Sequence, residues 1–260
     1  MGWTERQQAM LQEMGLRLWT PAPALPPVAA PATPAPAAVE PAPVAAAAAP
    51  RAAPAPAPVP VPLHTDGPAA TLDWPALRAA VAGCRACGLC ESRRQTVFGV
   101  GHPQAHCMVV GEAPGEQEDA QGEPFVGAAG QLLDRMLAAL GLGRSAATPE
   151  RQVFIANTLK CRPPRNRNPS PEELAACQPF LERQVALVQP RVILAMGRFA
   201  VQQLLGSDAP IGKLRGTVHQ WRGVPLVVSY HPAYLLRQPA DKAKAWDDLC
   251  QVAALLARTG

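Results

Sequence analysis

Residues 107–115 read Cys-Met-Val-Val-Gly-Glu-Ala-Pro-Gly. Apolar residues in a row, closed by a glycine, are typical of a strand that is buried on both faces. Three further runs of this kind occur at residues 153–156, 192–195 and 224–229. Helical patterns lie at residues 132–140, 170–188 and 241–258, and the third strand is followed by a helix through residue 205. This alternation predicts an α/β fold with a central, mostly parallel four-stranded sheet covered by helices on both faces.

The ends of the predicted strands carry the most informative motifs. Ligands of open α/β sheets bind outside the carboxyl ends of the strands. Polar or glycine-rich segments begin there at Gly111, Asn157 and His231. We therefore expect these three segments to meet in one functional site.

The chain divides into three parts by composition. Residues 21–68 contain 16 of the 31 prolines and 18 alanines, so residues 21–70 are predicted to form a disordered linker that is partly polyproline II. Residues 1–20 are predicted to form a short amphipathic helix, because Trp3, Met10, Met14 and Leu18 recur at helical spacing. That helix either docks on its own domain or binds a replication or repair protein. Residues 71–260 are predicted to form a single folded domain, which carries the site.

The folded domain has a mild excess of positive charge. Residues 71–260 contain 21 Lys and Arg against 16 Asp and Glu, and only four of the 21 are Lys. An arginine-weighted excess suits contact with phosphates. No stretch has the roughly 18 continuous apolar residues of a membrane span, and the polar N-terminus is atypical of a signal peptide. We expect a cytoplasmic monomer without a membrane segment.

In that compartment the seven cysteines are expected to be metal ligands or buried thiols. Four of them form two spaced pairs. The predicted ligands are Cys84, Cys87, Cys161 and Cys177. Four thiolates make a closed site suited to zinc or to a [4Fe–4S] cluster, and spacing alone does not choose between these metals. Cys90 offers a competing ligand, whereas Cys107 and Cys250 are expected to be buried thiols in the core.

Several segments, in order along the chain, resemble one family, the family 4 uracil-DNA glycosylases. The matching residues are 84–89 with Arg93, 97–99, 111–116, 122–127, 157–164 and 231–237. The resemblance implies a three-layer α/β/α fold like that of uracil-DNA glycosylases. It also implies hydrolysis of the N-glycosidic bond of uracil in single- or double-stranded DNA, which leaves an abasic site for base excision repair. The cofactor it implies is a [4Fe–4S] cluster, in preference to zinc.

Three residues in these segments fit the chemistry of uracil recognition. The amide of Asn157 has one donor and one acceptor, which match the Watson–Crick edge of uracil and oppose that of cytosine. Phe125 resembles the family's stacking platform for a flipped base. His231 resembles the family histidine that hydrogen-bonds to uracil O2 as negative charge develops on the leaving base.

The group that directs the attacking water is less evident. In the wider superfamily an aspartate occupies the position of Ala113, so this chain must use another group. Glu112 is the leading candidate, either through its side chain or by holding the loop. Ala113 and Gly115 are expected to border the substrate, since Pro114-Gly115 permits close approach of the backbone. Glu116, Glu118 and Asp119 are neighbours that could direct the water instead, although a solvated helix face is the more ordinary place for Glu118 and Asp119.

Contacts with DNA are expected from a basic loop and from the segment that follows His231. The predicted contacts are Lys160, Arg162, Arg165, Arg167, Leu235 and Arg237. In this set the cationic side chains are expected to contact phosphates. Leu235 or its neighbour Leu236 is expected to fill the space that the flipped base leaves. Cys161 and Cys177 bracket the basic loop, so the cluster is predicted to fix that loop and not to catalyse the reaction.

Two other functions stay open at this point. The first is a non-catalytic or covalent uracil-DNA binding protein, although no Lys-Arg-Arg-Ile-His insertion of the kind found in cross-linking relatives follows Cys161. The second is an iron–sulfur scaffold module that joins a replication or repair complex through residues 1–20. Strand preference, activity on other deaminated bases, the role of Cys90 and any redox role of the cluster do not follow from the sequence.

Overall fold

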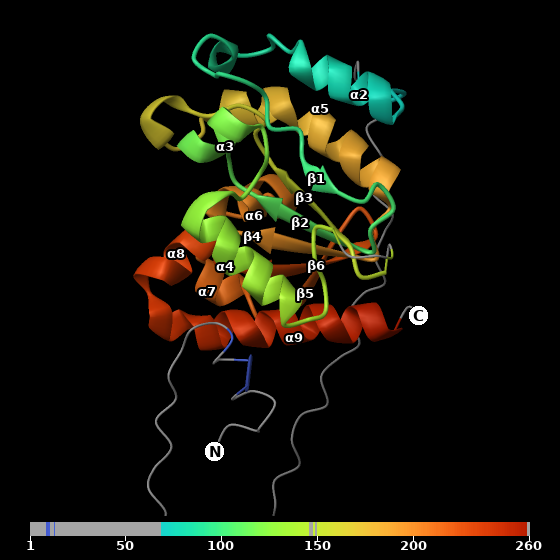
Figure 1. The fold of residues 1–260 in the computed structure, drawn as a ribbon, viewed down its shortest axis with the longest axis vertical. Coiled ribbons are helices and arrows are strands. Elements are labelled where there is room, and N and C mark those ends of the chain that lie inside the picture. Colours follow the sequence, from blue (N-terminus) through green and yellow to red (C-terminus); the bar gives the residue numbers. More distant parts are fainter. Residues whose placement is uncertain (1–8, 11–12, 14–68, 146–147, 149, 259–260) are drawn as a thin grey trace, which may run out of the picture.

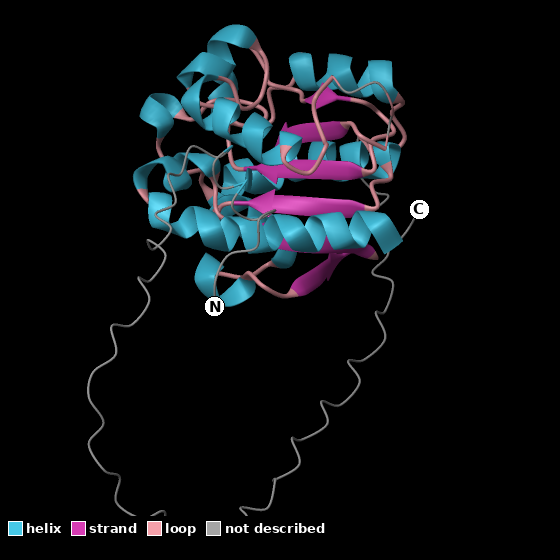
Figure 2. Cartoon of the chain, turned by 60° about the horizontal axis from the view of Figure 1, so that its bottom comes forward, coloured by secondary structure: helices cyan, strands magenta, loops and turns pink. Residues whose placement is uncertain are grey.

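The computed structural model describes residues 9, 10, 13, 69–145, 148 and 150–258. At its centre lies one six-stranded sheet with the order β1-β3-β2-β4-β6-β5. The strands are β1 (Val100–Gly101), β2 (Cys107–Gly111), β3 (Val153–Asn157), β4 (Val192–Met196), β5 (Val218–Trp221) and β6 (Val224–Ser229). Figures 1 and 2 show helices on both sides of this sheet, so the described part of the chain has three layers.

The four predicted strands are confirmed as β2, β3, β4 and β6, which run parallel to one another. The sheet nevertheless has two strands more than predicted, because an antiparallel strand was missed at each edge. β1 has only two residues, too few for any periodicity. β5 reads Val-His-Gln-Trp, and two of its four residues are exposed. A two-residue turn with positive φ at Arg222 and Gly223 joins β5 to β6, the geometry that suits a tight hairpin.

The helices pack on the two faces of the sheet in separate groups. Their bounds are α2 (Trp74–Ala82), α3 (Glu116–Gln121), α4 (Gly127–Ala138), α5 (Pro171–Val188), α6 (Arg198–Leu205), α7 (Ile211–Leu214), α8 (Pro232–Arg237) and α9 (Lys242–Arg258). Helices α4, α8 and α9 contribute to one hydrophobic core, and α2, α5 and α6 contribute to the other. Alternate residues of each central strand enter opposite cores, as Val109 and Val110 do in β2.

The predicted capping box begins α5 as expected. Ser170 Oγ accepts a hydrogen bond from the Glu173 amide, and Glu173 Oε2 accepts one from the Ser170 amide. Pro171 occupies the first helical position, where its missing N–H costs nothing. The start of α5 is thereby fixed directly after the basic loop, 162–169.

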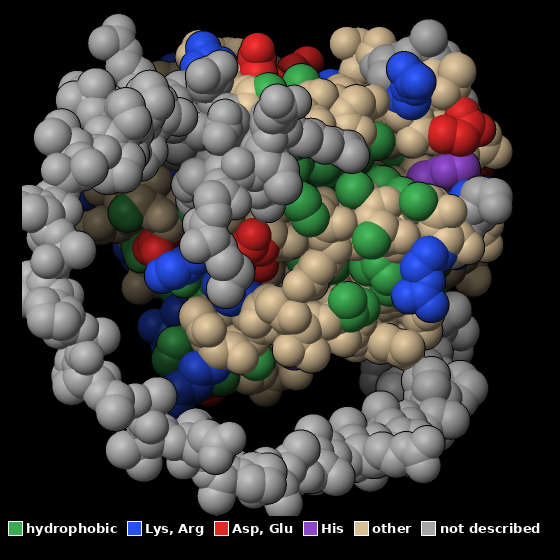
Figure 3. Space-filling view, turned by 90° about the horizontal axis from the view of Figure 1, so that it is seen from below, with side chains coloured by type: hydrophobic (Ala, Val, Ile, Leu, Met, Phe, Trp, Pro, Cys, Tyr) green, Lys and Arg blue, Asp and Glu red, His purple; other side chains and the backbone are tan. Residues whose placement is uncertain are grey.

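The predicted N-terminal helix and linker lie mostly outside the described residues. Ala9, Met10 and Glu13 are described, and all three are helical. Met10 is 8% exposed and belongs to the same core cluster as Trp246 and Leu249 of α9. Seen from below, hydrophobic side chains gather across the middle of that side of the molecule, with Lys and Arg mostly toward its rim (Figure 3).

None of the helices in the described residues has both the length and the apolar character of a membrane-spanning segment.

Candidate active site

A cleft of about 750 Å³ opens at the carboxyl ends of the parallel strands. Each of the four strands contributes to it, directly or through the residues that follow. The lining includes Glu112, Asn157, Gly197 and His231, which come respectively after β2, at the end of β3, after β4 and after β6. The structure therefore brings the three predicted motifs together, and it does so where open α/β sheets bind their ligands.

The narrow part of the cleft depends on the small size of Gly111. A Cβ atom built on Gly111 would overlap the Phe125 ring and lie 2.5 Å from Asn157 Oδ1. Gly111 and Asn157 face each other as register partners in β2 and β3. Only glycine lets the aromatic ring and the amide approach the same point from two sides.

The substitution Gly111→Ala is expected to lower kcat/KM by on the order of 100-fold, since displacing a positioning group by about 1 Å has an effect of that size. The added methyl group would push Phe125 away from Asn157. Rates on a single-uracil oligonucleotide, the substrate that the sequence resemblance implies, measure the effect. Gly143→Ala is the matched control, because a Cβ there meets no atom within 4 Å. Equal rates for the two variants would contradict the predicted close approach.

Phe125 is held in an uncommon backbone conformation. It is 5% exposed and has a φ of 52°, in the left-handed region that residues other than glycine seldom adopt. Arg144 clamps this segment by donating to the carbonyls of Pro124 (2.7 Å) and Phe125 (2.6 Å) and by pairing with Asp134 (2.7 Å). Such conformations persist when the surroundings fix them strongly, and they gather at functional sites.

Glu118 ties two loops of the cleft together. Its Oε2 accepts a hydrogen bond from the Gly115 amide, and its Oε1 accepts one from the Val126 amide, both at 3.0 Å. Asp119 is 2% exposed and accepts from the Arg94 amide. The expectation that these two acids lie on a solvated helix face is therefore wrong. Both carboxylates face inward and satisfy backbone N–H groups of loops that the sequence pattern does not bring together.

His231 is the N-cap residue of α8, and its ring lies against Phe125. The two rings are nearly parallel, with an interplanar angle of 25° and centroids 5.3 Å apart. His231 Nδ1 accepts a hydrogen bond from the Ala233 amide at 3.2 Å, so in the neutral ring the proton belongs on Nε2. Burial, assisted by the positive charge of Arg237, lowers the pKa of His231 to about 4. The ring is therefore neutral at physiological pH.

Glu112 forms part of the cleft wall, but its carboxylate is already engaged. Oε1 accepts a hydrogen bond from the Phe199 amide at 3.0 Å, at the start of α6. Burial raises the pKa of Glu112, while hydrogen bonds from the amides of Phe199 and Arg198 act in the opposite direction. The Glu112 carbonyl accepts from the Leu159 amide, which ties the loop after β2 to the segment after β3.

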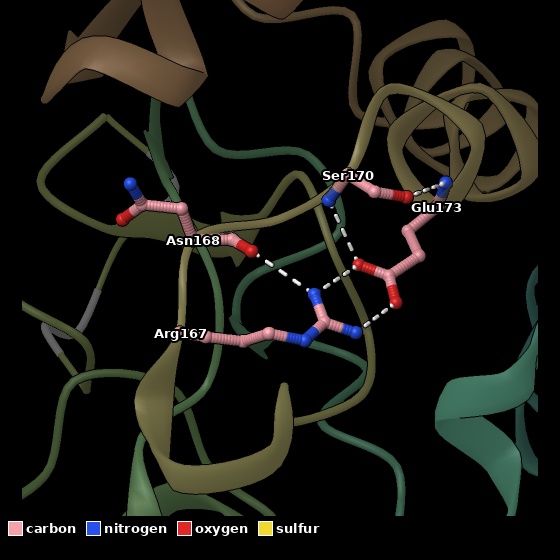
Figure 4. Close-up of polar contacts among 4 residues, drawn as sticks. All are labelled: Arg167, Asn168, Ser170 and Glu173. Atoms are coloured by element: carbon pink, nitrogen blue, oxygen red, sulfur yellow. Dashed lines mark hydrogen bonds and ion pairs between the residues drawn. The ribbon is translucent and has the colours of Figure 1, made fainter.

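One wall of the cleft is the basic loop, 162–169, and Arg167 fixes its end (Figure 4). Arg167 binds both carboxylate oxygens of Glu173, at 2.9 and 2.5 Å, and also donates to the Asn168 carbonyl. The ion pair lowers the pKa of Glu173. Arg167 thus holds the loop to the start of α5, so only part of its hydrogen-bonding capacity remains for another ligand.

Two of the predicted DNA contacts are wrong. Lys160 is 1% exposed and donates to two oxygens inside the protein, so it cannot reach a phosphate. Burial lowers its pKa to about 8, although Cys177 and Cys161 favour its charged form. Leu235 is 0% exposed in the core, whereas its neighbour Leu236 is 44% exposed. The other predicted cations, Arg162, Arg165 and Arg237, lie on or near the surface of this region.

Sequence reasoning missed other residues that line the cleft. Arg198 is an exposed cation there, and it is the first residue of α6, directly after Gly197. Tyr230 and Tyr234 stack on each other with centroids 5.0 Å apart, and both reach the cleft. The chain has only two tyrosines, and both flank His231, which is a signal that the sequence does offer.

A second, smaller cavity is lined by five cysteines. They are Cys84, Cys87, Cys90, Cys161 and Cys177. Three of the sulfurs accept N–H hydrogen bonds. The donors are the Arg93 guanidinium to Cys161 (3.0 Å), the Lys160 amide to Cys177 (3.3 Å) and the Ala86 amide to Cys84 (3.5 Å). Within the described ranges, no three Cys, His, Asp or Glu side chains are grouped tightly enough to hold one metal ion.

The two cysteines expected to be buried in the core differ. Cys107 in β2 is buried, as predicted. Cys250 is exposed, so that prediction is wrong. It lies on α9 beside inward-facing Leu249, and one residue along a helix turns a side chain by about 100°.

Comparison with known proteins identifies relatives of this chain. Residues 98–250 match the sequence model of the uracil DNA glycosylase superfamily. The chain is 40% identical to the type-4 uracil-DNA glycosylase of Archaeoglobus fulgidus over 183 residues, which are 67% of this chain and 89% of the relative. It is 42% identical to the type-4 enzyme of Thermotoga maritima over 63% and 83% of the two chains. A type-5 uracil-DNA glycosylase of Pyrobaculum aerophilum is 35% identical over 52% and 64%.

Proposed function

Because this chain belongs to the uracil DNA glycosylase superfamily, and with its type-4 members as relatives, we propose that its cleft excises uracil from DNA. The enzyme hydrolyses the N-glycosidic bond and leaves an abasic site for base excision repair. One observation carries the assignment of the site: Phe125, Asn157 and His231 converge on one cleft at the carboxyl ends of the sheet.

The flipped uracil stacks on Phe125 and is read by Asn157. The side-chain amide of Asn157 accepts from uracil N3–H and donates to O4, and it opposes cytosine with the same two groups. The close packing of Phe125 and Asn157 around Gly111 supports this role, since a base seated on the ring would have its polar edge beside the amide. A pocket held by Arg144 and Glu118 is formed before the base arrives, which lowers the cost of binding.

His231 donates a hydrogen bond from Nε2 to uracil O2. Negative charge develops on this oxygen as the glycosidic bond breaks, and a fixed donor stabilises that charge more in the transition state than in the ground state. The hydrogen bond from Ala233 to Nδ1 supports the required tautomer. A neutral imidazole suffices for this role, because it needs only the Nε2 proton.

Of the two roles expected for Glu112, we assign it the second, that of holding the loop. Its carboxylate is engaged by α6 and its carbonyl by the segment after β3. In this position it sets the path of Ala113, Pro114 and Gly115 along the cleft. That backbone then borders the sugar, where the attacking water must enter.

The DNA strand lies across the mouth of the cleft. Arg162, Arg165, Arg198 and Arg237 contact its phosphates, with Arg167 contributing from its ion pair. Leu236, in place of Leu235, fills the space left by the flipped base, because it is the exposed member of the pair.

The cysteine cavity fits a [4Fe–4S] cluster better than a single zinc ion. Zinc ligands converge on one ion at about 2.0–2.3 Å, whereas each thiolate of a cluster binds a different iron, so the sulfurs stand farther apart. The described cysteines line one cavity without converging on one point, and three sulfurs accept N–H bonds. Cys84, Cys87, Cys161 and Cys177 hold the cluster, which links the loop after α2 to the basic loop.

Cys161→Ser is expected to remove most of the bound iron, whereas Cys90→Ser is expected to keep it. Cys161 belongs to the proposed ligand set and Cys90 does not, although both line the cavity. Iron and zinc content of the purified proteins, with their visible spectra, measures the outcome. Loss of iron in Cys90→Ser together with retention in Cys87→Ser would show that the ligand set is wrong.

Release of free uracil tests the proposed function. Full-length protein with confirmed iron content is incubated with oligonucleotides that carry one uracil, as single strands and as duplexes, and alkali then cleaves abasic sites. We expect strand cleavage at uracil and none at cytosine or thymine. Intact strands would refute the proposed enzymatic function. A protein–DNA adduct that survives denaturation would instead indicate the covalent binding protein.

A further inference from the structure

Lys160 is buried beside the cysteine cavity, three residues after Asn157, which lines the cleft. Its side chain is 1% exposed, and it lines the cysteine cavity. The ammonium donates to the Asn157 carbonyl at 2.7 Å and to Gln184 Oε1 at 2.6 Å. A buried cation is normally stabilised by an anion, yet both of these oxygen partners are neutral.

In the proposed cluster, the cysteine thiolates would supply the negative charge that the two oxygen partners lack. Lys160 directly precedes Cys161, and its amide donates to Cys177 Sγ at 3.3 Å. Both sulfurs are ligands in the proposed set. Thiolates around a metal cluster carry negative charge, and a cation buried beside them is stabilised by that charge while it reduces their mutual repulsion.

The hydrogen bond of the Lys160 ammonium also reaches Asn157, the residue proposed to read the base. Asn157 is the last residue of β3, and its carbonyl is held by the ammonium while its side chain meets the cleft. Gln184 of α5 continues the chain of contacts by donating to the Phe98 carbonyl at 2.8 Å. The Lys160 carbonyl in turn accepts from the Val97 amide. The end of β3 is therefore anchored from the cluster side.

We propose that Lys160 is a positioning residue that couples the iron–sulfur cluster to uracil recognition. Its ammonium balances the charge of the cluster thiolates, and its hydrogen bond to the Asn157 carbonyl fixes the backbone of Asn157. This inference rests on the proposed function, because it needs Asn157 as the group that reads uracil. Loss of the cluster leaves the cation without a counter-charge and loosens the end of β3.

Lys160→Met tests both halves of this coupling. Methionine keeps most of the apolar stem and removes the charge. We expect kcat/KM on uracil-DNA to fall about 10- to 100-fold, as for the loss of hydrogen bonds to a charged group. The reduction potential of the cluster is expected to shift to a more negative value, because a nearby positive charge is gone. Voltammetry and iron content are measured on the same protein samples as the rates.

Two further variants separate charge from packing. Lys242→Met makes the same change at another buried lysine, on α9 and outside both cavities, and is expected to leave potential and rate unchanged. Gln184→Met removes an acceptor of the Lys160 ammonium and the donor to the Phe98 carbonyl, but it keeps the lysine charge. It is expected to lower kcat/KM without moving the potential, and it keeps the test available if Lys160→Met does not fold.

The outcomes distinguish this inference from the proposed function. A wild-type protein that releases no uracil refutes the proposed function, while the potential of Lys160→Met still tests the charge balance. If the wild type releases uracil and Lys160→Met matches it in rate and in reduction potential, the coupling is refuted and the proposed function stands. Wild-type rates in Gln184→Met likewise refute the positioning half.

Discussion

Replacing His231 by alanine is expected to lower kcat on uracil-DNA about 100- to 1,000-fold, the range found when one donor to a developing anion is removed. KM should change much less, because the hydrogen bond strengthens only as charge builds on O2. Phe125 loses its parallel neighbour in the variant, but Arg144 still holds its backbone. Single-turnover rates and steady-state KM on the same oligonucleotide measure the two effects.

His102→Ala is the control for this substitution, since that histidine lies outside the cleft lining.

The pH dependence of kcat provides a second check on the role of His231. Burial lowers the pKa of His231 to about 4, so kcat should show no inflection near the ordinary histidine value of 6.5. The unfolded chain binds a proton at His231 between these two values, and stability from this group is therefore lost as pH falls from about 6.5 through 4. A kcat inflection near 6.5 that disappears in His231→Ala would contradict a neutral donor.

Asn157→Asp is expected to lower kcat/KM for uracil about 100- to 1,000-fold and to narrow the preference for uracil over cytosine. The carboxylate keeps an acceptor for uracil N3–H but loses the donor to O4, so O4 is left without a hydrogen bond in a buried site. The negative charge of the carboxylate also repels the negative charge that develops on the leaving base. Paired rates on uracil and cytosine oligonucleotides measure both changes.

Asn157→Ala separates the two contributions. It removes the donor and the acceptor without adding charge, so it should lose activity while showing no new tolerance of cytosine. Iron content and circular dichroism of both variants show whether the fold persists. An Asn157→Asp protein with unchanged uracil rates would mean that another group reads the base, and the cleft would need a different orientation of substrate.

The central strands were predictable because burial on both faces leaves an unbroken apolar run in the sequence. The edge strands were not, since β5 is half exposed and β1 has two residues. The capping box at Ser170 was predictable for a local reason, as both of its hydrogen bonds lie within four residues.

The sequence indicated several residues that line the cleft, but it did not indicate where each side chain points. Lys160 follows Asn157 in a polar segment, and nothing local indicates that its side chain turns into the protein toward Gln184, which is 24 residues away. Leu235 and Leu236 are equivalent by composition, and the rotation of α8 decides which one is buried. Glu118 bridges two loops through contacts that depend on the complete fold.

The cleft is lined by residues at or after the ends of four strands that are far apart in the chain, and this arrangement affects how the protein is made. β6 and α8 are synthesised late, so His231 joins Asn157 only when nearly all of the domain has left the ribosome. Parallel strands also pair late, because their connections are long. A nascent or partly folded chain therefore lacks the assembled cleft, in which Asn157 and His231 come together.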